Sequence, residues 1–127
     1  MEPVVVLITV PDEKAARKLA KPLVEEGLAA CVNTVPGVRS IYRWEGKTCD
    51  EPEVLLIVKT RRACFEALER RVREVHPYSV PEVIALPIVE GSAPYLDWVA
   101  ASTRPGGRRA NGAAPRPRSR SRSTRRP

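Results

Sequence analysis

The chain has 127 residues, enough for one compact domain and too few for two, and its 22 basic and 15 acidic residues give a net charge of +7. Hydrophobic residues make up 43% of the total, and no apolar run approaches the ~18 residues that a membrane-spanning helix needs. These figures exclude an integral membrane protein, and the N-terminal segment has no basic stretch or cleavage site typical of an export signal.

The first two predicted elements are a strand and a helix. Residues Val4–Val10 form a β-branched run that Pro11 ends, which predicts a strand. Asp12 is placed to cap a following amphipathic helix, in which apolar residues recur about every four positions until Gly27 stops it. Pro22 lies inside this helix and removes one hydrogen bond, so we expect a bend there.

The middle of the chain is predicted to be mainly strand, over Leu28–Val35, Val38–Trp44 and Glu53–Thr60. Two of these runs are separated only by Pro36 and Gly37, a pair typical either of a hairpin turn or of a bend in one long strand. A turn is expected at Glu45-Gly46-Lys47.

A second helix, a strand and a third helix are expected next. Thr60 is a candidate cap for the second helix, whose apolar stripe is formed by Phe65, Leu68, Val72 and Val75 and which Pro77 ends. Residues Val83–Val89 predict another strand, and Ser92-Ala93-Pro94 is typical of a helix start.

The C-terminal segment is distinct in composition. Residues 104–127 hold nine arginines and no acidic residue, which leaves 13 basic and 15 acidic residues in 1–103. The segment's only hydrophobic residues are three alanines, too few to offset the entropy of folding. We therefore predict a folded domain over 1–103 and a disordered Arg/Ser/Pro-rich tail over 104–127. Its clustered arginines make the tail the one part of the chain that could contact nucleic acid, and the interpretation we favour is a solvated appendage or a non-native extension.

The order of elements predicts an α+β fold. If Pro36-Gly37 is a bend, the chain has the split β-α-β arrangement of ferredoxin-like folds with an additional C-terminal helix, and its helices cover one face of the sheet. Residues 4–8 and 54–58 are apolar on both faces of their strands. Because the second face would be an exposed apolar patch in a single chain, we expect an obligate oligomer.

Histidine and cysteine are the candidate metal ligands. His76, the only histidine, follows the second helix, where it either interacts with the helix dipole or binds metal with ligands from elsewhere. Cys31 is either a small buried hydrophobe or a soft-metal or redox site. Together with Cys49 and Cys64 it makes an odd number of cysteines without C-x-x-C spacing, which predicts reduced thiols and a cytoplasmic location.

A ligand cleft is the third candidate site. Polar-tipped or charged residues lie at predicted strand ends and in loops, where pockets are often built, namely Tyr42, Trp44, Lys59, Tyr78 and Glu82. The alternative is that their side chains pack at a subunit interface. No catalytic triad, Cys-His pair or phosphate-binding glycine loop is present in the sequence, so we do not expect an enzyme.

Several segments together resemble a known family. These are residues 6–11, 28–33, 40–47, 59–60, 76–82 and 94–98, with sequences VLITVP, LAACVN, SIYRWEGK, KT, HPYSVPE and PYLDW. They closely resemble the CutA family of divalent-cation tolerance proteins, in register from about Val4 to Trp98. The resemblance implies a ferredoxin-like homotrimer, similar to the PII-type signalling proteins, in which strands of neighbouring subunits join edge to edge. It also implies a role in tolerance of copper or another divalent cation.

Part of the family's copper pattern is absent. Copper binding by some members is ascribed to a cysteine on the first strand and a pair of histidines before Pro-Tyr; here Ile8 and Val75 replace the cysteine and the first histidine, and only His76 matches. His76 and Cys31 are therefore the remaining candidate metal ligands. The alternative function is a trimeric binding module whose clefts between subunits, lined by Trp44, Lys59, Tyr78 and Glu82, take a small anionic ligand or a protein partner.

Overall fold

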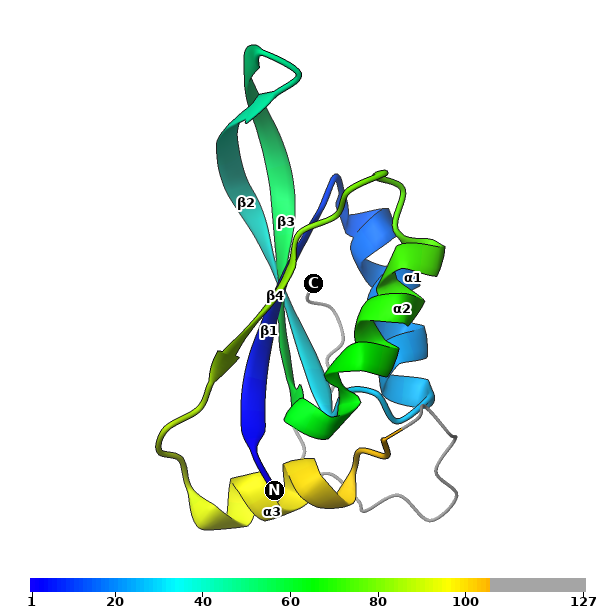
Figure 1. Ribbon diagram of the computed structural model, residues 1–127, viewed down its shortest axis with the longest axis vertical. Helices are drawn as coiled ribbons and strands as arrows, with labels where there is room; N and C mark the ends of the chain where they lie inside the picture. The colour runs from blue at the N-terminus through cyan, green and yellow to red at the C-terminus, as the bar shows by residue number, and fades with distance from the viewer. Residues whose placement is uncertain (106–127) are drawn as a thin grey trace.

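The computed structural model describes residues 1–105, and the predicted tail from residue 106 onward lies outside them. One antiparallel sheet with the strand order β2-β3-β1-β4 forms the body of the molecule (Figure 1). The elements are β1 (Pro3–Val10), α1 (Glu13–Glu25), β2 (Cys31–Trp44), β3 (Lys47–Arg61), a short 3-10 turn (Arg62–Cys64), α2 (Phe65–Val75), β4 (Val83–Pro87) and α3 (Ala93–Ala101). This order confirms the predicted α+β fold of split β-α-β type with an additional C-terminal helix.

The start and end of α1 are set by the residues that the sequence suggests. The carboxylate of Asp12 accepts a hydrogen bond from the backbone N–H of Ala15 at 2.8 Å, which caps the helix. Pro22 lies inside the helix, and Gly27, two residues after its end, adopts a left-handed φ of 75°. The predicted cap and stop are therefore confirmed.

Pro36 and Gly37 bend one continuous strand. The β2–β3 register shifts between Val35 and Val38, and Gly37 has a φ of 82°, a conformation that glycine adopts without strain. The hairpin turn is at Glu45-Gly46, where both residues have positive φ. Beyond the bend, the β2–β3 hairpin projects past the helices and the rest of the sheet (Figure 1).

Several predicted boundaries differ from the structure, among them the end of β4, which is at Pro87 and not at Val89. Thr60 does not cap α2 but is fully buried in β3, where its hydroxyl donates to the carbonyl of Leu28 at 2.7 Å. β2 begins at Cys31 and not at Leu28, and β3 begins at Lys47, six residues before the predicted start. The hairpin segment from Lys47 to Pro52 escapes sequence analysis because both of its faces are largely exposed, so its residues show no apolar alternation.

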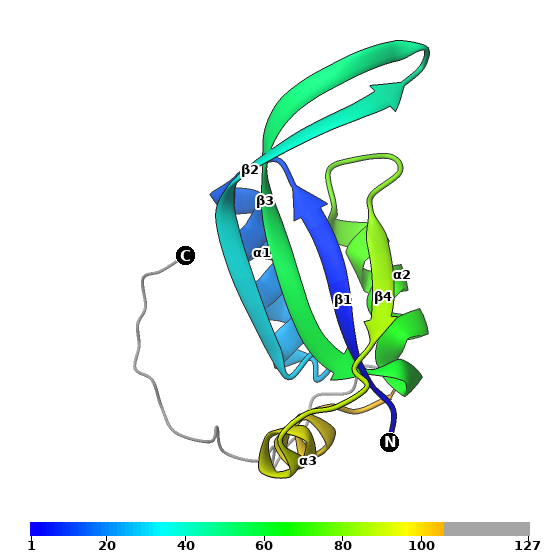
Figure 2. The same cartoon turned by 90° about the vertical axis from the view of Figure 1, so that its left-hand side faces the viewer.

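The sheet has one covered and one open face. Alternate residues of β1 and β3 are buried against α1 and α2, namely Val4, Val6, Ile8, Val10, Val54, Leu56 and Val58. The residues between them point to the other face, where Figure 2 shows no covering helix. We call this the open face and define it by Val5, Leu7, Leu55, Ile57, Ile84 and Leu86. Both faces are thus apolar, as predicted, and Ile84 and Leu86 are about half exposed.

The last helix closes one end of the sheet. α3 lies across the end of the sheet opposite the hairpin (Figure 1). Just after α3, the hydroxyl and carbonyl oxygens of Thr103 accept hydrogen bonds from the guanidinium of Arg61 at 2.9 and 2.6 Å.

Within residues 1–105, no helix is long and apolar enough to cross a membrane.

Candidate functional site

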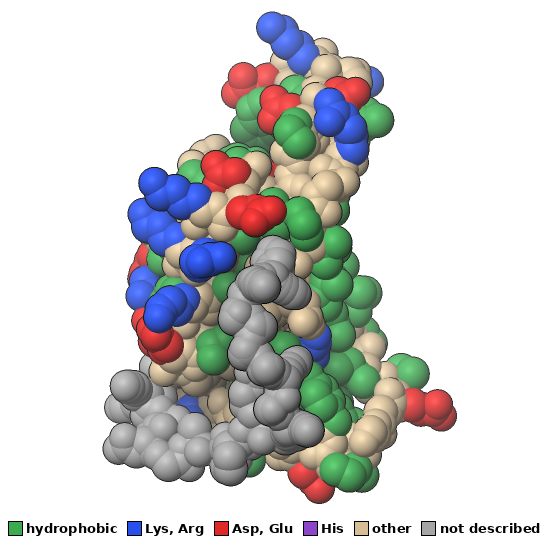
Figure 3. Space-filling view, turned by 180° about the vertical axis from the view of Figure 1, so that it is seen from behind, with side chains coloured by type: hydrophobic (Ala, Val, Ile, Leu, Met, Phe, Trp, Pro, Cys, Tyr) green, Lys and Arg blue, Asp and Glu red, His purple; other side chains and the backbone are tan. Residues whose placement is uncertain are grey.

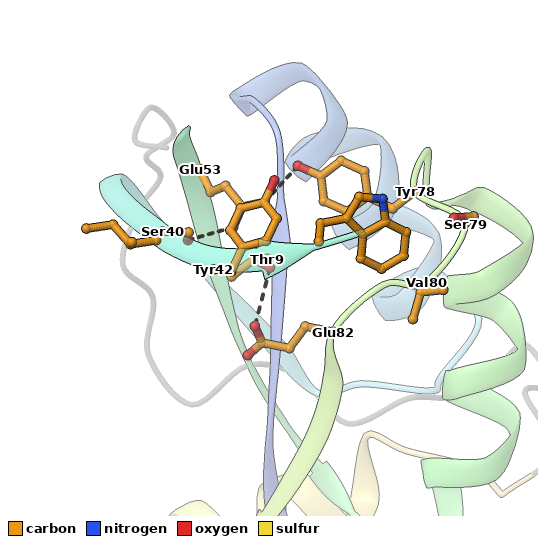
Figure 4. Close-up of a pocket in the computed structure, with 10 residues that line it drawn as sticks. Thr9, Ser40, Tyr42, Glu53, Tyr78, Ser79, Val80 and Glu82 are labelled. Carbon is orange, nitrogen blue, oxygen red and sulfur yellow. Dashed lines mark hydrogen bonds between the residues drawn. The ribbon is translucent and has the colours of Figure 1, made fainter. Parts of the chain in front are cut away.

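A pocket of about 510 Å³ lies where the projecting hairpin leaves the sheet. Its walls come from the end of β1, from both strands of the hairpin and from the loop between α2 and β4 (Figure 4). The lining residues are Thr9, Ser40, Ile41, Tyr42, Trp44, Glu53, Tyr78, Ser79, Val80 and Glu82. We refer to it as the hairpin pocket.

Glu53 is a buried carboxylate at the wall of this pocket. Its residue is only 7% exposed, and its two oxygens accept hydrogen bonds from the hydroxyls of Ser40 and Tyr78, both at 2.7 Å. Both donors are neutral, and no ion pair to Glu53 occurs among residues 1–105. Since buried charges in proteins are normally paired with a cation or bind a metal, this carboxylate favours a positive ligand.

The tyrosine hydroxyls of the pocket stay protonated at ordinary pH. Burial, and then the hydrogen bond to Glu53, raise the pKa of Tyr78 far above its usual value of 10.0. Desolvation followed by the carboxylate of Glu51 raises the pKa of Tyr42 as well. The phenol of Tyr78 is therefore a permanent donor that holds the carboxylate of Glu53 in place.

The charge of the lining is entirely negative. Glu82 is the second carboxylate, and its Oε1 accepts a hydrogen bond from the hydroxyl of Thr9 at 3.5 Å (Figure 4). Among residues 1–105, no lysine or arginine lines the pocket, and the aromatic rings that do come from Tyr42, Trp44 and Tyr78. Carboxylates and aromatic faces both attract cations, so this lining suits a cationic ligand better than an anionic one.

His76 supports the pocket from behind. Its Nδ1 accepts a hydrogen bond from the backbone N–H of Tyr78 at 3.1 Å, so the proton of the neutral ring is on Nε2, which donates to the carbonyl of Thr9 at 2.7 Å. The residue is 7% exposed, and its ring packs against that of Tyr78 with centroids 4.8 Å apart. Both nitrogens thus fasten the α2–β4 loop to β1, and a metal ion would have to displace one of these partners.

Cys31 and Lys59 lie away from the pocket. They face each other in register on β2 and β3, and the ammonium of Lys59 donates to the amide oxygen of Asn33. Along β3, Lys59 is four residues, or about 13 Å, from Leu55, the partner of Thr9. The structure therefore brings together the predicted cleft residues Tyr42, Trp44, Tyr78 and Glu82, and it separates Lys59 and Cys31 from them.

No metal cluster is preformed in the described part of the chain. Across residues 1–105 there is no group of three or more His, Cys, Asp or Glu side chains close enough to hold a metal ion. All three cysteines are unpaired, and Cys64 is completely buried. That His76 and Cys31 bind a metal remains a prediction, and the fold does not place these two side chains in one cluster.

Sequence analysis missed Glu53, Ser40 and Thr9. The position of Glu53 at the head of an apolar run suggested only a strand terminus, because its burial depends on a loop 25 residues away. One signal was present: alternation along the strands places Glu53 and Thr9 on the same face of the sheet as Leu55. Glu53 is an acidic residue on a face of β3 that is otherwise apolar, and a carboxylate in such a position needs a specific partner.

Comparisons with known proteins agree with this architecture. A family model described as CutA1 divalent ion tolerance protein matches residues 4–102. A divalent-cation tolerance protein CutA from Thermus thermophilus is 59% identical over 99 residues, which are 78% of this chain and 96% of the relative. A chloroplastic CutA protein from Arabidopsis thaliana is 54% identical over 101 residues, 80% of this chain and 56% of the relative.

Solved structures show the same fold. The structure of the Cut A1 divalent cation tolerance protein from Thermus thermophilus has a TM-score of 0.79 and 57% identity, and the match covers 80% of this chain and 99% of that one. CutA1 from Oryza sativa has a TM-score of 0.80 and 50% identity, with 82% of this chain and 95% of that one covered. The chain described here therefore belongs to the CutA1 family of divalent ion tolerance proteins.

Proposed function

We propose that this protein acts in tolerance to divalent cations as a non-enzymatic homotrimer, and that the hairpin pocket is where it binds the cation. The observation that carries the proposal is the buried carboxylate of Glu53, which has two neutral hydroxyl donors and no cationic partner among residues 1–105. A divalent cation in the pocket would supply the missing positive charge. Carboxylate and hydroxyl oxygens are ordinary ligands of such ions, and copper would take additional nitrogen or sulfur ligands.

The open face supports an oligomer. Leu7, Ile57 and Ile84 lie side by side across three strands on a face that no helix covers. When neighbouring subunits cover this surface, its apolar side chains are removed from water, which stabilises the assembly by about 25 cal/mol for each Å² of apolar surface buried. Thr9 and Glu53 continue the same face, so a neighbour that covers it also approaches the pocket. One chain supplies two carboxylates to the pocket, those of Glu53 and Glu82, and a neighbouring subunit can supply the further ligands that a metal ion needs.

The test is a calorimetric titration of the full chain with Cu(II) and Zn(II). Glu53→Gln keeps the shape of the side chain and removes its charge, and we expect it to weaken cation binding tenfold or more. Glu90→Gln, a neutral substitution at an exposed position in the loop between β4 and α3, is the matched control and should bind as the unsubstituted protein does. Equal binding by all three proteins would remove the cation from the hairpin pocket.

Two further variants test the other candidate ligands. If Cys31→Ser and His76→Ala both keep the affinity while Glu53→Gln loses it, the two residues predicted from the sequence are not ligands. A loss confined to Cys31→Ser would move the site to the far end of β2. His76 also accepts a hydrogen bond from the backbone of Tyr78. A loss of cation affinity in His76→Ala therefore identifies His76 as a ligand only if the melting temperature of that variant is unchanged.

A second candidate function is a trimeric binding module for a small ligand or a protein partner. The pocket volume of about 510 Å³ is typical of small-molecule sites, and its aromatic side chains Tyr42 and Trp44 are exposed. Since the lining is negative, an anionic ligand would need a basic residue from a neighbouring subunit. Titration with phosphate and with small organic ammonium ions separates these classes.

For location we propose the cytoplasm, which the three unpaired thiols support.

A further inference from the structure

The hairpin pocket has apolar walls as well as carboxylates. Ile41 and Val80 line it and are well exposed, and the rings of Tyr42 and Trp44 are exposed beside them. A bare divalent ion binds through oxygen atoms and bound water, and it makes no use of such walls. A pocket of about 510 Å³ with aliphatic and aromatic walls is typical of sites for small organic molecules. The pocket therefore has room and contacts for a ligand with a carbon skeleton.

The surroundings of the pocket favour an organic cation over an organic anion. Arg39, a basic residue of β2 next to the lining residue Ser40, does not line the pocket and is paired with Asp50 at 2.8 Å. On the face of the molecule seen in Figure 3, Lys and Arg side chains gather mostly over the helices, and hydrophobic and acidic side chains lie side by side on the projecting hairpin. A positive ligand therefore meets complementary charge at the hairpin.

Glu53 has acceptor sites left for a further donor at the buried end of the pocket. It accepts one hydrogen bond from each of the hydroxyls of Ser40 and Tyr78, and a carboxylate offers about four acceptor sites. Within residues 1–105 its charge has no cationic partner, although the residue is only 7% exposed. An ammonium group carries N–H donors and a positive charge. It would supply both to Glu53 without displacing either hydroxyl.

Glu82 supplies a second negative charge at a separate point of the pocket. It is exposed, it lies in the loop between α2 and β4, and its carboxylate accepts the hydrogen bond from the hydroxyl of Thr9 (Figure 4). Thr9 is paired with Leu55, and Glu53 lies two residues, or about 7 Å, away from Leu55 along β3. The pocket thus has one buried and one exposed carboxylate, which matches a ligand with a positive charge at each end.

We propose that the hairpin pocket binds a short α,ω-diammonium alkane, with one ammonium group on Glu53 and the other on Glu82. The methylene chain between the two groups packs on the aliphatic and aromatic walls, and the faces of Tyr42 and Trp44 attract the ammonium groups. This inference rests on the proposed function in that both place a cation in the hairpin pocket. It adds an organic dication to the ligand classes of that pocket.

The experiment is a calorimetric titration of the full chain with putrescine and, separately, with butylamine, at about pH 7, where primary amines are protonated. The two amines have the same carbon chain, and butylamine has one ammonium group instead of two. Putrescine should bind about fivefold or more tightly than butylamine. Glu82→Gln, at an exposed position, should reduce this difference to within about twofold. Glu90→Gln, the matched control, should leave the difference unchanged.

Two results would overturn the inference. Equal affinities for the two amines, or no binding of either, would show that the pocket does not recognise a dication. Equal losses in Glu82→Gln and Glu90→Gln would show that net charge alone attracts it. Binding of Cu(II) or Zn(II) without a preference for putrescine would contradict this inference and leave the proposed function, whereas a preference for putrescine without metal binding would contradict the proposed function alone.

Discussion

The phenolic hydroxyl of Tyr78 donates a hydrogen bond of 2.7 Å to the carboxylate of Glu53, and this contact joins the α2–β4 loop to the β2–β3 hairpin. One residue comes from a loop without regular structure and the other from the strand where the hairpin leaves the sheet. Their contact closes one wall of the hairpin pocket (Figure 4). The shape of the pocket therefore depends on a pairing between segments 25 residues apart.

Removing this hydroxyl should destabilise the fold. Tyr78→Phe leaves the buried carboxylate of Glu53 with the hydroxyl of Ser40 as its remaining donor, which costs about 1–3 kcal/mol. Urea unfolding at a fixed protein concentration measures the difference, because the stability of the proposed trimer would depend on concentration. Tyr42→Phe, at an exposed position, should change stability by less than about 0.5 kcal/mol. Equal effects of the two substitutions would contradict this role of Tyr78.

The raised pKa of Tyr78 predicts a loss of stability in alkali. Above the usual value of 10.0 the unfolded chain releases the phenolic proton, while the folded protein retains it. The free energy of unfolding therefore receives its full contribution from this group below pH 10 and declines as the pH rises further. Because Tyr78→Phe lacks the group, its stability should approach that of the unsubstituted protein above about pH 10. Parallel pH profiles of the two proteins would argue against the shift.

Gly46 should be the most sensitive position of the hairpin turn. Its φ of 80° is one that residues with a Cβ adopt only at a cost, although a Cβ there would meet no atom within 4 Å. Gly46→Ala should lower the free energy of unfolding by about 1 kcal/mol. Gly46→Asn should cost less, since asparagine tolerates the left-handed region. Thermal unfolding of both variants checks the order, and an equal cost would attribute the loss to something other than backbone conformation.

The helix layer contains one well-formed ion pair. The guanidinium of Arg71 meets the carboxylate of Glu26 through contacts of 2.8 to 3.1 Å, and both side chains are about one-third exposed. A double-mutant cycle of Glu26→Ala and Arg71→Ala should give a coupling of about 0.5–1 kcal/mol that weakens with salt. The same cycle on the more exposed pair of Lys21 and Glu25 should give less than half of this value.

A charge on the open face should break the proposed trimer. Ile57 lies at the centre of that face, between Leu7 and Asn33 on the neighbouring strands. Sedimentation equilibrium of Ile57→Asp should give the 14.1 kDa of one chain at micromolar concentration, while the unsubstituted protein gives three times that mass. Val24→Asp, at a partly exposed position on α1, should remain trimeric. A trimeric Ile57→Asp would show that this face is not the interface.

Most of the fold follows from local signals in the sequence. Asp12 caps α1 in the expected place because an N-cap depends on residues within one turn. At Pro36-Gly37 the sequence predicts only an interruption, and the β2–β3 register is what distinguishes the bend from a hairpin turn. Thr60 misled the analysis because a threonine before a helix and a threonine buried in a strand look the same until the carbonyl of Leu28 is placed beside it.

The candidate site follows from the sequence only in part. Tyr42, Trp44, Tyr78 and Glu82 line one pocket, since each lies at a strand end or in a loop on the same side of the sheet, and their role in binding a ligand stays a prediction. Lys59 does not line the pocket, because it lies four residues further along β3 than Leu55, the partner of the pocket residue Thr9. Such positions depend on pairing between distant segments, and a single sequence carries no direct signal for register across a sheet.

The most direct test of the proposed function is a crystal structure of the full chain soaked in Cu(II), with diffraction recorded at the copper absorption edge. We predict a trimer whose open faces are covered by neighbouring subunits, with one anomalous peak in each hairpin pocket at coordination distance from the carboxylate of Glu53. A monomer, or a copper peak at Cys31 with none in the pocket, would contradict the account.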